Sequence, residues 1–68
     1  MGKILVEMDG AKKVVEFKGK RIKVSSLLEL LNLYPETAVV VKQGKLLCDD
    51  RWLEDGEEVE VVVATSRG

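Results

Sequence analysis

Only one segment of the sequence has the pattern of an α-helix, and this limits the folds that the chain can adopt. The segment reads SSLLELLNLY and is followed by the sole proline, Pro35. A serine at its start, Ser25 or Ser26, can accept a hydrogen bond from a backbone N–H, and Glu29 stands three residues after Ser26, as in a capping box. The residue before a proline is disfavoured in the helical region. The pattern therefore predicts a helix over about residues 25–33 that ends before Pro35.

The leucines of this segment predict which side of the helix is buried. Leu27, Leu30 and Leu31 follow the i, i+3, i+4 spacing that places side chains on one helical face, and Leu28 borders that face. We therefore expect the helix to pack on a sheet through this stripe, with Leu30 in the core.

The segments before and after the helix have the patterns of two β-hairpins. The stretch KILVEMDGAKKVVEF predicts a hairpin with its turn at Asp9-Gly10 and a return strand over residues 14–17. The stretch TAVVVKQGKLL predicts strands over residues 38–42 and 45–47 that are joined at Gln43-Gly44. The Asp9-Gly10 dipeptide tolerates the positive φ that tight hairpin turns require.

The remaining residues predict a connection and a final strand. In CDDRWLEDGEE, Asp49 or Asp50 can cap a single helical turn over residues 51–53, and Trp52 is expected to anchor this loop against the sheet. The valine-rich stretch EVEVVVA then predicts a central strand that runs parallel to the first one. Its two faces differ: one carries three valines, and the other carries Glu58, Glu60, Val62 and Ala64.

The order of elements is therefore ββαβββ, which predicts an α+β domain over residues 1–64 with a mixed sheet and one helix packed across one face. The chain has no histidine and one cysteine, Cys48, so zinc-finger spacing and nucleophile–histidine sites are excluded. We expect no catalytic residue, no bound cofactor and no metal site, and we interpret Cys48 as a packed or idle thiol.

Charge and hydropathy exclude two further classes of function. Eleven basic and twelve acidic residues nearly balance, whereas nucleic-acid modules usually carry a strongly basic face. The basic stretch KGKRIK, residues 18–23, is interpreted as a solvated loop. No apolar run approaches the roughly 20 residues that span a bilayer. We therefore expect a cytoplasmic monomer that binds neither nucleic acid nor membrane.

The order of elements and three stretches resemble the ubiquitin-like β-grasp family. The likeness is closest to its prokaryotic sulfur carriers, which include the thiamine-thiazole carrier, the small subunit of molybdopterin synthase and archaeal small modifier proteins. The first stretch, VSSLLELLNL, resembles the family's single helix. The second, VVVKQGKLL, resembles its strand–turn–strand unit. The third, RWLEDGEEVEVVVATSRG, resembles its acidic final strand and glycine end.

This resemblance implies that residues 65–68 form a flexible tail whose last residue, Gly68, carries an activated acyl group. A ubiquitin-activating-type enzyme would use ATP to adenylate the carboxylate. In a sulfur carrier, sulfur would then convert this adenylate to a thiocarboxylate for thiamine or molybdopterin synthesis or tRNA thiolation. In a protein modifier, the acyl group would be conjugated to a lysine. Ser66 and Arg67 would form the arm, and Arg67 stands where the family has its first glycine.

The expected contact surface for the activating enzyme consists of Val62, Ala64 and Val40. Val62 and Ala64 alternate with Val61 and Val63, so they should face away from the helix. The sequence does not distinguish a sulfur carrier from a protein modifier. A function of another class also stays open, namely a non-covalent β-grasp interaction module with an inert tail.

Overall fold

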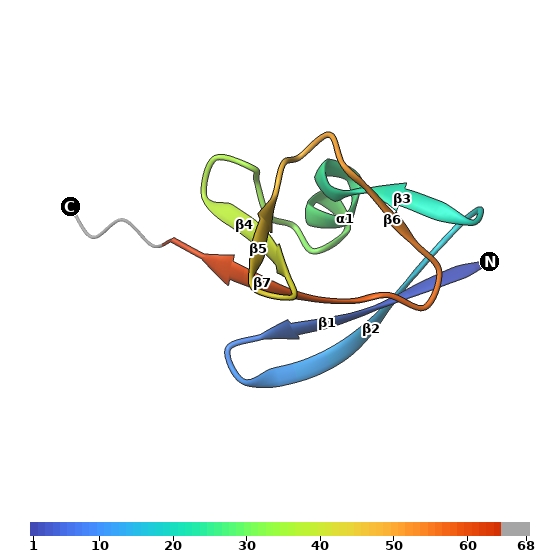
Figure 1. Ribbon diagram of the computed structural model, residues 1–68, viewed down its shortest axis with the longest axis horizontal. Helices are drawn as coiled ribbons and strands as arrows, with labels where there is room; N and C mark the ends of the chain where they lie inside the picture. Colours follow the sequence, from blue (N-terminus) through green and yellow to red (C-terminus); the bar gives the residue numbers. More distant parts are fainter. Residues whose placement is uncertain (65–68) are drawn as a thin grey trace.

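The computed structural model describes residues 1–64 (Figure 1). Within these residues the chain forms seven strands and one helix, and no helix is both long and apolar enough to cross a membrane. In chain order the elements are β1 (Gly2–Met8), β2 (Ala11–Phe17), β3 (Arg21–Lys23), α1 (Val24–Leu30), β4 (Ala38–Lys42), β5 (Lys45–Leu47), β6 (Trp52–Glu54) and β7 (Glu58–Val63).

Both predicted hairpins are present, and each has a two-residue turn. The φ angles are 55° and 76° at Asp9 and Gly10, and 53° and 78° at Gln43 and Gly44. Positive φ at both central residues is the requirement of a type I′ turn, whose twist matches that of the strands. The tight turn extends the pairing up to Ala11, so β2 is longer than the return strand that the sequence predicted.

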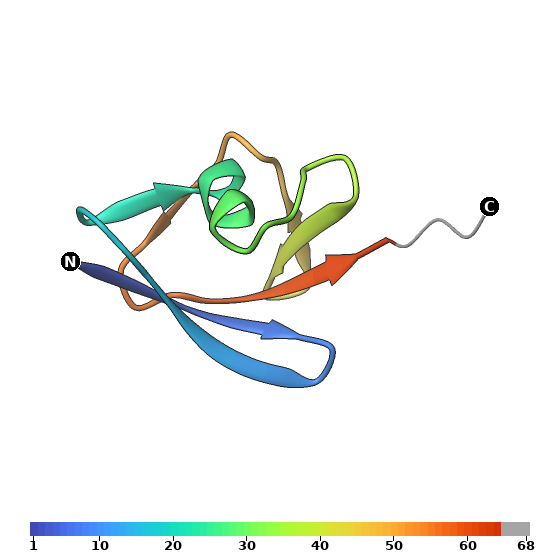
Figure 2. The ribbon, with the colours of Figure 1, turned by 180° about the vertical axis from the view of Figure 1, so that it is seen from behind.

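The main sheet has the strand order β2-β1-β7-β4-β5, with β7 in the middle. β7 is parallel to β1, with Val6 opposite Val59, and antiparallel to β4, with Val40 opposite Val61. The prediction of a central final strand parallel to the first strand is confirmed. The helix lies across one face of this sheet (Figure 2), so the expected α+β architecture is also confirmed.

A second sheet, formed by β3 and β6, replaces the loop and the helical turn that the sequence predicted. The two strands are antiparallel, and Ile22 lies opposite Leu53. Both of these side chains are buried, whereas their neighbours along each strand are exposed. Burial of one apolar residue from each segment explains why they pair as short strands.

The start of α1 differs from the predicted serine cap. The helix begins at Val24, and its N-cap, Lys23, makes no side-chain hydrogen bond. Instead, the N–H of Val24 donates to the carbonyl of Arg51 at 2.9 Å, and the N–H of Ser25 donates to the carbonyl of Asp49 at 3.0 Å. The segment before β6 therefore satisfies two of the N–H groups that a helix start leaves unpaired.

The helix also ends earlier than predicted, and Pro35 is not the cause. Asn32 has a φ of 61°, the left-handed conformation that commonly follows a helix. The N–H of Leu33 donates to the carbonyl of Leu28 at 2.8 Å, and the N–H of Asn32 donates to that of Glu29 at 3.0 Å. This pair of bonds is a Schellman motif. Asparagine adopts this conformation more readily than most residues, and it ends the helix after Leu30.

The buried face of α1 is rotated from the predicted stripe. Val24, Leu27 and Leu28 are buried and Leu31 packs against them, whereas Leu30 is 54% exposed, so the prediction that Leu30 belongs to the core is wrong. The core lies between α1, the second sheet and the inner face of the main sheet. Its members are Ile4, Val6, Val15, Phe17, Ile22, Val24, Leu27, Leu28, Ala38, Val40, Leu53, Val59 and Val61.

Candidate functional site

The face of the main sheet opposite α1 carries a cluster of apolar side chains. Val39 lies opposite Val62 in the β4–β7 register, and Val41 lies opposite Leu46 in the β4–β5 register. Residues that face each other across paired strands point to the same side of a sheet. We call these four residues, Val39, Val41, Leu46 and Val62, the outer patch.

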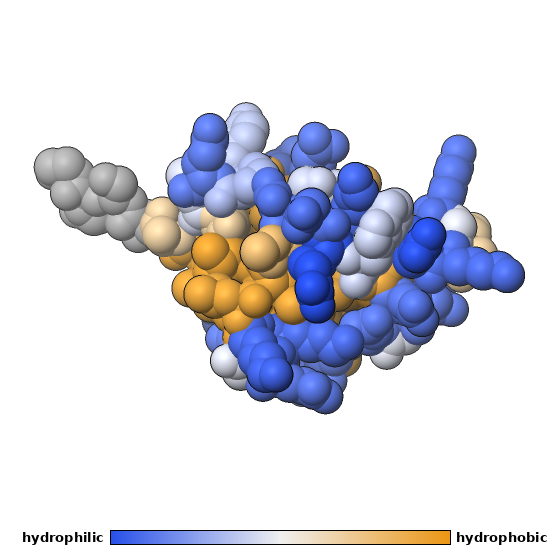
Figure 3. All heavy atoms as spheres, turned by 45° about the horizontal axis from the view of Figure 1, so that its top comes forward, coloured by the Kyte–Doolittle hydropathy of each residue, from blue (hydrophilic) through white to orange (hydrophobic). Residues whose placement is uncertain are grey.

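The outer patch is open to solvent. Leu46 is 70% exposed, Val62 44% and Val39 41%, and Val41 is half-buried. Figure 3 shows apolar side chains gathered over the part of the molecule that contains β4, β5 and β7, with hydrophilic side chains around them. Single exposed apolar residues are common on proteins, whereas a contiguous group often marks an interaction site. The patch is therefore the candidate functional site.

A hollow of about 560 Å³ lies beside the outer patch. Val41 belongs to both, so the apolar patch and the hollow are continuous. Four glutamates and one lysine are among the residues that line the hollow. Its lining residues are Glu7, Val41, Lys42, Gln43, Gly44, Glu57, Glu58, Val59 and Glu60.

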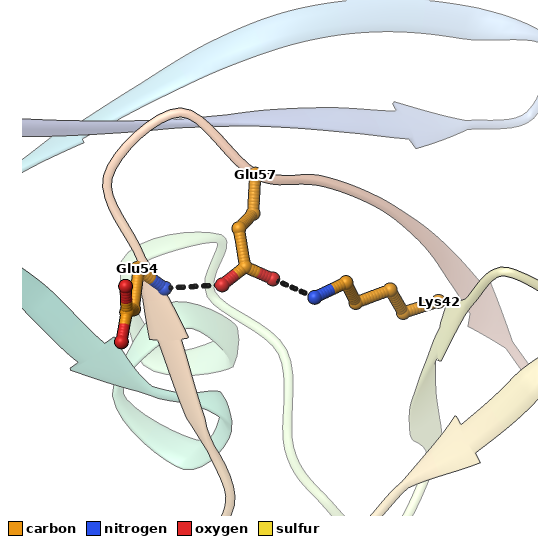
Figure 4. Close-up of polar contacts among 3 residues, drawn as sticks. All are labelled: Lys42, Glu54 and Glu57. Atoms are coloured by element: carbon orange, nitrogen blue, oxygen red, sulfur yellow. Dashed lines mark hydrogen bonds and ion pairs between the residues drawn. The ribbon is translucent and has the colours of Figure 1, made fainter.

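The cation of the hollow, Lys42, is held by Glu57 (Figure 4). Its ammonium donates a hydrogen bond to one carboxylate oxygen of Glu57, and the N–H of Glu54 donates to the other oxygen at 2.9 Å. Partial burial alone would raise the pKa of Glu57, but both hydrogen bonds and the charge of Lys42 outweigh it, so this pKa lies below its usual value of 4.5. Glu57 is thus ionised at neutral pH, and it neutralises Lys42.

The residues predicted to contact a partner do not all lie on the surface. Val62 and Ala64 are exposed, as expected. Val40 is fully buried, because its register with Val61 places it on the inner face, so its assignment to a partner surface is wrong. Three neighbouring valines, residues 39–41, show no polar alternation that would reveal which of them points inward. The predicted tail residues Ser66, Arg67 and Gly68 lie outside the described residues.

Three residues of the outer patch were missed by sequence reasoning. Val39, Val41 and Leu46 share a face with Val62, but this becomes visible only when the β4–β7 and β4–β5 registers are known. The turn at Gln43-Gly44 was a usable signal, because a two-residue turn fixes the pairing of Val41 with Leu46.

Trp52 does not occupy the position expected for it, and Cys48 is not packed. Trp52 is 48% exposed on the outer side of the second sheet, where the Arg21 guanidinium lies 4.6 Å and the Lys23 ammonium 5.4 Å from its ring centroid. It therefore packs beneath two cations and does not anchor a loop on the main sheet. Cys48 is an exposed free thiol.

The comparisons with known proteins identify the fold. No family model and no curated protein match the sequence. Among solved structures, the chain is similar to the UBL domain of Plasmodium falciparum Dsk2, with a TM-score of 0.71 over 93% of this chain and 97% of that chain, at 18% identity. The fold is a ubiquitin-like β-grasp. In this β-grasp domain the residues of the outer patch come from three neighbouring strands, β7, β4 and β5, so the strand order of the fold brings them together.

Proposed function

We propose that this β-grasp domain is a protein-interaction module that binds a partner through the outer patch. The supporting observation is the contiguous group of four apolar side chains on the sheet face that the helix leaves uncovered. Full burial of a valine or leucine side chain is worth about 1.5–3 kcal/mol. A partner that covers the patch therefore gains affinity that neighbouring charged positions do not provide.

The experiment compares two substitutions of the same kind on the outer face. Val62→Glu places a charge within the patch and should weaken partner binding by more than about tenfold, since desolvation of the carboxylate opposes association. Val14→Glu is the matched control, because Val14 is also an exposed valine on the outer face but lies on β2, away from the patch. Both variants should keep the parent's thermal midpoint.

The measurement has two stages. Proteins retained from source-cell extract by the parent and by the two variants are compared by quantitative mass spectrometry. A protein retained by the parent and by Val14→Glu is then purified and titrated calorimetrically. Equal affinity of that protein for the parent and for Val62→Glu would remove the outer patch from the interface.

The second candidate function is activation at Gly68, as a sulfur carrier or as a protein modifier. It is supported by the resemblance of residues 51–68 to the acidic strand and glycine end of that family. An ionised carboxylate is a poor electrophile, so a partner enzyme would use ATP to form an acyl-adenylate with release of pyrophosphate. A sulfur donor or a thioester-forming cysteine would then displace AMP. In this case Val62 and Ala64 would contact the activating enzyme.

Intact-mass spectrometry tests this candidate with a chain that ends at Gly68. Incubation with an adenylating enzyme of the source cell, ATP and a sulfur donor should replace one oxygen by sulfur, or should yield a lysine conjugate. Deletion of Gly68 should abolish the product, and Arg67→Gly should react as fast as the parent or faster, because it removes a bulky side chain next to the reacting residue. If neither the parent nor Arg67→Gly is modified, the activation candidate is lost and the interaction module stands.

A further inference from the structure

Three carboxylates gather on the outer face beside the outer patch. Glu7 and Glu60 are direct partners in the parallel β1–β7 register. Glu58 precedes Glu60 by two residues, and alternation along a strand places both on the same side. Like charges that face each other across strands destabilise a sheet. The domain therefore maintains an arrangement of charge that is unfavourable in the absence of a cation.

The lysines near these carboxylates leave much of the negative charge uncompensated. Lys12 lies opposite Glu7 in the β1–β2 register, but its ammonium is 3.7 Å from Glu58, and both side chains of that pair are more than half exposed. Such a surface pair contributes little. Lys42 is neutralised by Glu57. Within residues 1–64, neither Glu7 nor Glu60 takes part in an ion pair.

The acidic hollow and the outer patch are positioned to act together. Glu7, Glu58 and Glu60 line the hollow together with Val41. Val41 is the direct partner of Glu60 in the β4–β7 register, so an apolar side chain and a carboxylate stand side by side on neighbouring strands. Directly opposed residues have Cβ atoms about 4.5–5.5 Å apart, which is close to the spacing of residues one helical turn apart.

We propose that the partner segment combines an apolar side chain, which lies on the outer patch, with a lysine or arginine, which enters the hollow between Glu7 and Glu60. This inference rests on the proposed function and specifies the chemistry of the partner. A cation in the hollow relieves the repulsion between the two carboxylates, whereas an acidic segment adds to it. Complementary charge at the rim of an interface selects the partner and accelerates its association.

The probes are two short synthetic helical peptides with identical leucine positions. One carries lysine four residues from each leucine, and the other carries glutamate at those positions. Each is titrated into the isotope-labelled protein and followed by backbone amide NMR. The lysine peptide should shift the resonances of the outer patch and of Glu60, and its dissociation constant should rise with salt. The glutamate peptide should bind at least about tenfold more weakly.

A charge-reversal pair provides the matched control. Glu60→Lys should weaken binding of the lysine peptide by about tenfold or more and should improve binding of the glutamate peptide. Glu29→Lys makes the same change in net charge at an exposed position of α1, which covers the opposite face of the sheet, and should leave both affinities unchanged. A dispersed amide spectrum for each variant verifies the fold, and Glu60→Gln gives a milder test at the same position.

Three results would overturn the inference. Equal binding of the glutamate peptide at the outer patch shows that the patch does not select cations, and it leaves the proposed interaction function standing. Shifts that map away from the patch and Glu60 show that the lysine peptide binds elsewhere. The absence of binding by either peptide contradicts the proposed partner chemistry. The proposed interaction function is tested separately, by comparing partner binding of Val62→Glu with that of Val14→Glu.

Discussion

Leu27→Ala is expected to lower the free energy of unfolding by about 2–5 kcal/mol. Leu27 is completely buried on the face of α1 that packs against the main sheet. The substitution removes buried methyl groups and leaves a cavity that a short helix fixed at both ends can fill only in part. Because small domains are stable by only about 5–15 kcal/mol in total, the loss should be visible as a large decrease in the urea midpoint.

Leu30→Ala is the matched control for this prediction. Leu30 lies on the same helix and loses the same atoms, but more than half of its side chain is already exposed. Its substitution should change the free energy of unfolding by less than about 1 kcal/mol. Equal losses for the two variants would show that α1 presents a different face to the sheet.

Gly2→Ala is expected to destabilise the domain by about 1–3 kcal/mol, although alanine usually suits a strand better than glycine. A Cβ at Gly2 would lie closer than 3.0 Å to three atoms of the Phe17 ring, which is its buried partner in the β1–β2 register. The ring would have to move within the core. The measurement is the denaturant midpoint of the variant against that of the parent.

A double-mutant cycle separates this clash from other effects of Gly2→Ala. Phe17→Leu removes the ring and should be destabilising by itself, because it opens space in the core. If the clash is the cause, Gly2→Ala should cost less in the Phe17→Leu background than in the parent. Strict additivity of the two substitutions would refute the steric explanation.

The parts of the fold that sequence predicts well are those governed by local chemistry. Asp9-Gly10 and Gln43-Gly44 supply the positive φ of two-residue turns, and each turn then sets the register of its hairpin. The position of β7 was also predictable, because a valine-rich segment suits a strand with neighbours on both sides.

The parts that were predicted wrongly depend on contacts between distant segments. A leucine-rich helix offers more than one possible stripe, and only Val24, just before the predicted start, shows which one is buried. The second sheet was missed because three-residue strands are too short to show a period, and the pairing of Ile22 with Leu53 joins segments about thirty residues apart. Likewise, α1 is capped by backbone carbonyls of Asp49 and Arg51, so its serines gave a misleading signal.

The candidate site was predictable only in part. Alternation along β7 correctly placed Val62 on the exposed side, since glutamates mark that face. The same reasoning failed in β4, where Val39, Val40 and Val41 carry equivalent side chains and only pairing with β7 separates the inward residue from the outward ones. Which residues of the three strands share the outer face can be predicted only once the registers of the strands are known.

The location of β7 constrains the order in which the domain can form during translation. β7 is the last strand of the described chain, yet it alone joins the β1–β2 hairpin to the β4–β5 hairpin. Until residues 58–63 have left the ribosome, β1 and β4 each present an unpaired edge, which can pair with other chains. The sheet is therefore completed by contacts between the two ends of the sequence, and this long-range closure slows folding relative to a helical domain of equal size. Those two edges are protected only when β7 pairs with both β1 and β4.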